Sequence, residues 1–185
     1  MKISNFRSTL PLTQYISRHH APVQCGEACR QCRNFNRIWT CPPFDYDPLD
    51  RLGTYSYVTL FAQKVELPAR IPLADLPEIL RPIKKEIMDR MLDLEKENDG
   101  FACILAGECD LCAPQSCTRA EGRVCRHPDI TRPSLEAFGF NLRSTISDLF
   151  GLDFAWGTDG FAPPYLILVT ALFHNSPKIL SPDNR

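Results

Sequence analysis

Cysteine is the residue type whose spacing in this sequence most clearly predicts chemistry. Nine of the 185 residues are cysteine, and an odd number fits a disulfide framework poorly. Eight of them form two groups of four, each within a short stretch of chain, and thiolates bunched in this way are ligands for zinc or for iron–sulfur clusters. The sequence therefore predicts two separate metal sites, with these ligands: Cys25, Cys29, Cys32 and Cys41 in the first, and Cys109, Cys112, Cys117 and Cys125 in the second.

The spacing within the groups bears on which metal they hold. Zinc sites usually set two cysteine pairs a dozen or more residues apart. Here three cysteines are bunched and the fourth follows within one loop, and Pro42 comes directly after Cys41, in the manner of bacterial ferredoxin loops. Aromatic residues around the first group are expected to exclude water from a cluster: Phe35, Trp39, Phe44 and Tyr46. We therefore expect two [4Fe–4S] clusters, with zinc as the alternative.

Other residues near the two groups have less specific patterns. Seven arginines flank the cysteines, and they are expected either to compensate the charge of the thiolates or to form a docking patch for an acidic partner or an anionic substrate. Cys103 is predicted to be a buried apolar residue, with a ninth ligand or a reactive thiol as the alternative. His127 is predicted to be a loop histidine, with an alternate ligand or proton donor as the second interpretation. His19 and His20 are expected to be solvated, and Glu136 to cap a helix or to serve the second site.

Five segments are expected to position these groups. Three stretches rich in β-branched and aromatic residues predict strands: 54–67, 101–106 and 165–173. Two stretches with apolar residues at helical spacing predict helices: 73–97, whose early prolines confine the regular helix to its later part, and 133–150. The alternation predicts an α/β fold with a small mixed sheet of three or four strands, covered by two main helices. The sequence predicts one domain over residues 1–185, with cysteine-rich metal-binding loops at 25–46 and 103–128.

Composition and charge exclude several classes of function. The net charge of −1 gives no reason to expect a nucleic-acid partner. No apolar run is long enough to span a membrane, and no secretory signal is visible at the N-terminus. We therefore expect a cytoplasmic protein, and in that reducing compartment dense cysteines indicate metal binding rather than disulfides.

The sequence resembles a known family in the motifs around both groups. These motifs are Cys-Pro-Pro from Cys41, Ala-Gly-x-Cys-x-x-Cys from Ala106, Cys-Arg-His-Pro from Cys125, and Arg-Pro-Ser-Leu-Glu-Ala from Arg132. They are similar to those of the bacterial and archaeal proteins described as predicted metal-binding proteins, a domain of unknown function. The resemblance extends over about residues 25–173. It implies cysteine-bound metal in both segments and a self-standing cytoplasmic protein, and it implies no substrate.

Three functions fit these observations. The first is electron transfer or redox accessory work with two iron–sulfur clusters and a redox partner protein. The second is a structural zinc protein that acts as an interaction module. The third is an enzyme whose second cluster, flanked by arginines, acts on a small anionic substrate. The sequence does not say whether the protein is an enzyme, and it leaves the oligomeric state open.

Overall fold

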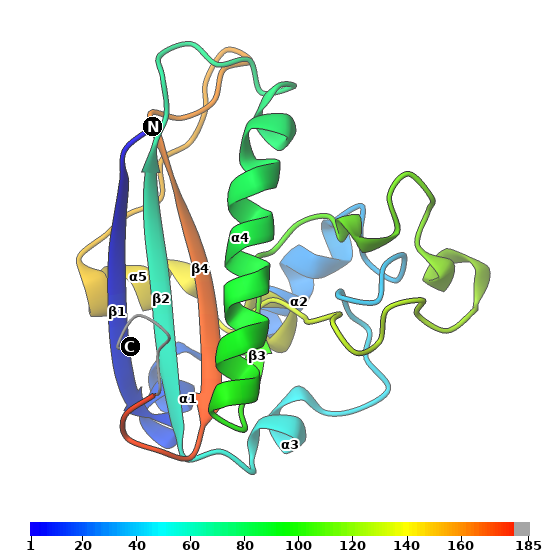
Figure 1. Cartoon of the computed structure of the whole chain (residues 1–185), viewed down its shortest axis with the longest axis vertical. Coiled ribbons are helices and arrows are strands. Elements are labelled where there is room, and N and C mark those ends of the chain that lie inside the picture. Colours follow the sequence, from blue (N-terminus) through cyan, green and yellow to red (C-terminus); the bar gives the residue numbers. More distant parts are fainter. Residues whose placement is uncertain (180–185) are drawn as a thin grey trace.

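A four-stranded sheet forms the centre of the molecule (Figure 1). The computed structural model describes residues 1–179. The strand order is β1-β2-β4-β3, and each neighbouring pair is antiparallel, so the α/β fold class is confirmed while the sheet is antiparallel rather than mixed. Strand β2 returns antiparallel to β1, and β4, the last strand in the sequence, lies between β2 and β3 and runs antiparallel to both. The strands are β1 (Ile3–Pro11), β2 (Tyr57–Glu66), β3 (Phe101–Cys103) and β4 (Tyr165–His174).

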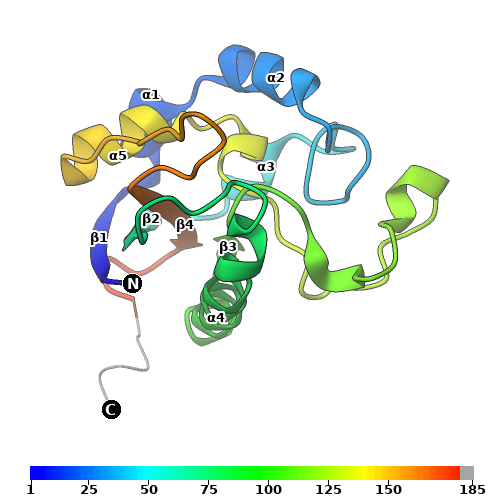
Figure 2. The same cartoon turned by 90° about the horizontal axis from the view of Figure 1, so that it is seen from above.

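Strand β4 lies between β2 and β3, and helices cover both of its faces (Figure 2). Its nearly continuous apolar sequence follows from this position, because successive side chains point to opposite faces. Ala171 and Phe173 join the core beneath α1 (Leu12–His19) and α5 (Leu142–Phe150). Leu172 points to the other face, where it packs with Met91 of α4 (Leu76–Glu97). The sheet therefore has two hydrophobic cores, one on each side.

Helix α4 begins near its predicted position and continues through both prolines. Pro77 occupies its first turn, where a backbone N–H has no partner within the helix. Pro82 lies inside the helix, so the expectation that the prolines would confine the regular helix to its later part was wrong. Buried Leu80, Ile87 and Met91 hold this face of the helix against the molecule despite the missing hydrogen bond at Pro82.

The second predicted helix, 133–150, is two elements. A single 3₁₀ turn, η3 (Glu136–Phe138), ends at Gly139, which has a left-handed φ of +86°. The regular helix α5 begins after Asn141, whose side chain accepts a hydrogen bond from Ser144 N at 3.1 Å. The apolar stripe was identified correctly, but a glycine turn and an N-cap interrupt it.

Several elements in the cysteine-rich and N-terminal segments were not predicted. Strand β1 and helix α1 precede α2 (Pro22–Gln31), which begins with a proline at a favoured first position. Three short elements lie in the cysteine-rich segments and beside them: α3 (Pro48–Leu52), η1 (Asp110–Cys112) and η2 (Thr118–Glu121). Within residues 1–179, no helix has the length and apolar character needed to cross a membrane.

Candidate metal centre

The first cysteine group is built on a helix and a series of turns, so the prediction of a loop over 25–46 was wrong for its first part. Cys25 and Cys29 lie one turn apart on α2, and this spacing places both on one helix face. Cys32 is the C-cap residue, and its backbone N–H donates to Cys29 O at 3.0 Å. The chain then turns until Cys41 N donates to Ile38 O at 3.1 Å. Helix and turns thus fix the backbone of all four cysteines.

The thiols of this group are close enough to influence one another electrostatically. Partial burial raises the pKa of Cys25 and Cys29, and the charges of their neighbouring cysteines raise these pKa values further. The pKa of Cys41 is raised to about 11, mainly by burial, and Cys32 and Cys29 contribute. Thiolates at these positions need a compensating cation, which a bound metal supplies.

Glu136 lies beside the first group and not the second. Its carboxylate raises the pKa of Cys25 and of Cys29. It also shares with Cys29 the lining of a cavity of about 380 Å³. Glu136 lies there because the η3 turn packs against α2. It does not cap α5, whose N-cap is Asn141, and the alternative interpretation, that it serves the second site, was also wrong.

The second group occupies irregular chain held by local hydrogen bonds. Cys109 precedes η1, Cys112 ends it, and Cys117 precedes η2. The buried Thr118 hydroxyl donates to Val124 O at 2.7 Å, which closes the loop between the third and fourth cysteines. The sulfur of Cys125 accepts a hydrogen bond from His127 N at 3.3 Å and lies 3.3 Å from Thr131 Oγ1. Backbone and hydroxyl groups therefore orient the last sulfur of the group.

The thiol of Cys109 is close enough to the other three cysteines of the second group to be influenced by their charges. Burial raises the pKa of its thiol, and Cys117, Cys125 and Cys112 raise it further through their charges. A set of four cysteine thiols, without carboxylate or other oxygen ligands, suits zinc or an iron–sulfur cluster. Within residues 1–179, no three His, Cys, Asp or Glu side chains are grouped closely enough to hold a single metal ion.

The two cysteine-rich segments lie side by side (Figures 1 and 2). The side chain of Arg119 joins them. Its guanidinium donates to Ile38 O at 3.0 Å and also to the carbonyls of Cys41 and Pro43. The same group lies 5.1 Å from the ring centroid of Trp39. One side chain of the second segment therefore satisfies three backbone acceptors of the first.

Three further contacts cross between the segments. Trp39 Nε1 donates to the Arg123 carbonyl at 3.2 Å. Asn34 Nδ2 donates to Gly107 O at 3.3 Å, and beside it the Arg33 guanidinium pairs with the Glu108 carboxylate. Contacts therefore occur near Cys32 and Cys41 on one side and near Cys109 and Cys125 on the other.

The arginines near the cysteines mostly bind protein groups other than sulfur. Arg132 forms an ion pair with Glu95 in which both side chains are only 13–14% exposed. Arg123 pairs with Glu121, and Arg126 donates to the Ser116 carbonyl at 2.9 Å. These contacts hold the loops in place. At Cys41 an arginine compensates a thiolate: the charge of Arg119 lowers the pKa of Cys41, although burial outweighs this effect.

Three of the aromatic residues expected to cover the first site pack against other parts of the molecule. Phe44 and Tyr46 are half-buried, and both rings make edge contacts with the buried Phe138. They anchor the chain that leaves Cys41 to the main core. Trp39 lies instead between the two cysteine-rich segments, against Arg119.

Cys103, His19 and His174 are buried away from both cysteine groups, whereas His127 contacts the second group. Cys103 is fully buried within the main core, as predicted. His127 contacts the second group through its backbone N–H, which donates to the Cys125 sulfur, and not through its imidazole. No signal in the sequence indicated this contact. The prediction that His19 is solvated was wrong: it is buried, and its Nδ1 lies 3.0 Å from Ser144 Oγ. His174, for which no role was predicted, is also buried, with Nε2 2.8 Å from Thr59 Oγ1.

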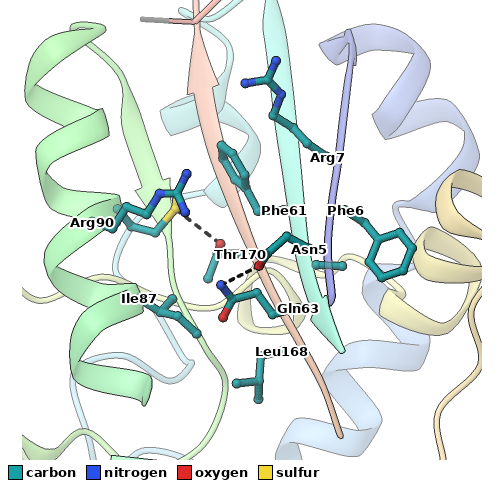
Figure 3. A pocket seen from close by; sticks show the side chains of 11 residues that line it. Asn5, Phe6, Arg7, Phe61, Gln63, Ile87, Arg90, Leu168 and Thr170 are labelled. Carbon is teal, nitrogen blue, oxygen red and sulfur yellow. Dashed lines mark hydrogen bonds between the residues drawn. The ribbon is translucent and has the colours of Figure 1, made fainter. Parts of the chain in front are cut away.

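Cavities lie both next to the cysteines and away from them. One of about 310 Å³ includes Cys109 in its wall, and another of about 280 Å³ includes Cys125. A smaller cavity of about 140 Å³ lies over the sheet between β1, β2 and α4 (Figure 3). Gln63 donates to Asn5 there at 2.9 Å, and the Thr170 hydroxyl donates to the Met91 sulfur at 3.3 Å. This cavity has no cysteine in its lining, so the cavities beside Cys109 and Cys125 concern the predicted sites more directly.

The fold and the site define an α/β protein with two adjoining cysteine-rich segments. The chain belongs to the family described as "Predicted metal-binding protein (DUF2284)", whose sequence profile matches residues 10–169. No curated protein and no solved structure matches the chain significantly. Metal binding is thus the property that the family and the cysteine pattern share.

Proposed function

We propose that this metal-binding protein holds one [4Fe–4S] cluster at each cysteine group and passes electrons through them to or from a redox partner in the cytoplasm. The observation that carries the proposal is the packing of the two segments on each other through Arg119. Two clusters held in adjoining segments would form a short electron path. Each cluster would supply one-electron redox chemistry, and the chain would supply its ligands and surroundings.

The surroundings of the cysteines support clusters over zinc. The ligand groups are bunched, and Cys41 is followed by a proline, as in ferredoxin-type loops. Cys125 accepts a hydrogen bond from the His127 backbone, and hydrogen bonds to ligand sulfurs help to set the potential of a cluster. Except for the exposed Cys32, the predicted ligands are half-buried, which would limit the access of water to the metal. All nine cysteines lie within the described residues and none forms a disulfide, which is consistent with a reducing compartment.

The surface beside the second group supports the approach of a partner. Val124, directly before Cys125, is an apolar side chain that is 83% exposed. Arg126 and Arg123 lie on either side of this pair in the sequence. An exposed apolar side chain bordered by arginines is suited to the transient docking of an acidic redox protein.

The alternative is a structural zinc site at each group. Zinc would hold each cysteine group in place as a cluster would, and it would give the same family-level description. The zinc alternative predicts a colourless protein with no unpaired electron after reduction.

Anaerobic purification with matched variants tests the proposal. The wild type should absorb broadly near about 400 nm, and reduction should give electron paramagnetic resonance signals of two clusters broadened by their mutual interaction. Cys29→Ser and Cys112→Ser should each lose about half of the iron and the broadening, because each removes one cluster. Cys103→Ala is the control and should keep both clusters. Variants that retain all of their iron, or stoichiometric zinc in the wild type, would contradict the proposal.

A further inference from the structure

Four cationic side chains line a cavity next to Cys109: Arg81, Lys84, Lys85 and Arg132. This cavity, of about 310 Å³, is bounded by α4 and by residues 104–111, which lead from β3 into the second cysteine group. Cys109 forms part of one wall, and Thr40, the neighbour of Cys41, forms part of another. The cavity therefore adjoins both cysteine-rich segments and is at the lower end of the size range for small-molecule sites.

Most of the inner wall is apolar. It is formed by Ile87 and Met88 from α4 and by Ile104, Leu105 and Leu111 from the facing segment. Ile87 is buried, and Ile104 and Leu105 pack against the core beneath α4. An apolar wall held by a core is suited to the hydrocarbon part of a ligand.

The cations around this wall are paired with carboxylates, with one exception. Arg81 pairs with Glu78, Lys85 with Asp89 and Arg132 with Glu95. The half-buried Lys84 has no hydrogen-bond or ion-pair partner within the described part of the chain. A partly desolvated ammonium group without a counter-ion is stabilised by a bound anion.

Lys84 is also aimed at the chain that carries Cys109. A Cβ added to Gly107 would lie 3.7 Å from Lys84 Nζ, which places the ammonium group beside the backbone two residues before Cys109. Of the two acidic residues in the lining, Glu108 is paired with Arg33, and Asp110 is exposed. The inner part of the cavity thus offers a positive charge next to an apolar wall.

We propose that this cavity binds a small organic acid, with its carboxylate paired to Lys84 and its apolar body against Ile87 and Leu105, next to Cys109. The acid would be the substrate or effector that the second site acts on or senses. Only that role of the bound acid rests on the proposed cluster function; binding itself depends on the cavity. The inference is therefore testable whatever metal the cysteines hold.

Titration calorimetry on the purified, metal-loaded protein tests it, with hexanoate and benzoate as probes. Hexanoamide and benzamide are the uncharged matched probes, and acetate is the matched anion without an apolar body. We expect the two larger carboxylates to bind at one site per chain, and the amides and acetate to bind at least about tenfold more weakly.

Variants on α4 locate the site. Lys84→Gln should weaken hexanoate and benzoate binding about tenfold or more, whereas Lys84→Arg should retain most of it. Lys96→Gln removes the same charge from the exposed last turn of α4 and should leave binding unchanged. Equal binding by wild type and Lys84→Gln, equal loss in Lys96→Gln, or no binding of any carboxylate would overturn the inference. If the amides or acetate bind as tightly as the larger acids, the proposed ligand class is wrong.

Metal analysis of the same samples separates this inference from the proposed function. Carboxylate binding that depends on Lys84 in a zinc-loaded protein would sustain the cavity assignment and reject the clusters. Iron–sulfur clusters without such binding would give the opposite result.

Discussion

The Arg119 guanidinium donates a hydrogen bond to the backbone carbonyl of Cys41, although the two residues belong to different cysteine-rich segments. Because Arg119 follows Cys117 by two residues, the contact links a predicted ligand of the first site to the chain of the second. Carbonyls in irregular chain lack the partners that a helix or strand would provide, and one planar cation satisfies three of them here. The two sites are therefore expected to depend on each other structurally.

Replacing Arg119 should weaken the first site more than the second. Arg119→Gln removes charge-assisted hydrogen bonds to three carbonyls, so we expect a loss of about 1–3 kcal/mol in the free energy of unfolding. Metal should be lost selectively from the first site during dialysis. Arg119→Lys should rescue little, since an ammonium group does not match the fork of the guanidinium. Arg123→Gln, which removes only an exposed ion pair with Glu121, is the control for thermal melts and metal content.

Gly139 should be required for the position of α2, and hence of Cys25. Its φ of +86° disfavours any side chain, and an added Cβ would lie 2.9 Å from His20 Nε2 and 3.2 Å from Pro22 Cα. Gly139→Ala should therefore cost about 1–2 kcal/mol in backbone strain and in addition displace the start of α2.

Gly151 offers a matched control for that substitution. It has a φ of +63°, but a Cβ there would meet no heavy atom within 4 Å. Gly151→Ala should lower the melting temperature without changing metal content, whereas Gly139→Ala should also reduce occupancy of the first site. Equal metal content in the two variants would show that α2 does not depend on this contact.

The ion pair between Arg132 and Glu95 should be one of the more important polar interactions of the fold. Glu95 accepts from Arg132 Nε at 2.8 Å and from Ala102 N at 2.6 Å, so it links α4, β3 and the chain after Cys125. Glu95→Gln should cost about 2–4 kcal/mol in chemical denaturation, because it leaves a mostly buried guanidinium without its counter-ion. Asp89→Asn breaks the exposed pair with Lys85 and should cost less than about 0.5 kcal/mol. Similar costs for the two variants would contradict this assignment.

Two buried histidines should make the protein less stable in mild acid. Burial lowers the pKa of His174 and of His19 below the ordinary value of about 6.5. The unfolded chain then binds more protons than the folded chain below that pH. Stability should therefore be fully present above about pH 6.5 and decrease as the pH falls towards the folded pKa values, by at most about 1.4 kcal/mol per pH unit for each histidine.

A single substitution separates these contributions. His174→Gln keeps a polar group near Thr59 but removes the titration, so the stability of this variant should depend less steeply on pH between about pH 6.5 and 5. His20→Gln leaves both buried imidazoles in place and should follow the wild type. Comparing each variant with the wild type at every pH cancels the pH dependence of metal binding, which the three proteins share. Parallel curves for the wild type and His174→Gln would reject the assignment.

The central strands could be predicted from the sequence because they are apolar on both faces or alternate strongly. Residues 54–67 and 165–173 contain β2 and most of β4, where burial determines the composition. Strand β1 was missed because it lies at the sheet edge, where its backbone pairs with β2 while most of its side chains stay exposed or half-buried. Its polar sequence carries little periodic signal.

The candidate site was predictable in composition but not in arrangement. Cysteine spacing identified the eight predicted ligands. Pro22, followed by cysteines four residues apart, is a local signal for the start of α2. By contrast, the contact of Arg119 with the Cys41 carbonyl joins residues 78 positions apart. Local pattern does not encode such a contact, since it depends on how the sheet and α4 place the two segments. The same holds for Glu136, which the η3 turn carries to the first site.

Metal and acid-labile sulfide analysis of anaerobically purified wild-type protein tests the central claim most directly. Two [4Fe–4S] clusters predict about eight iron atoms and about eight sulfide ions per chain, with little zinc. A colourless protein with about two zinc ions per chain and no labile sulfide would contradict the account.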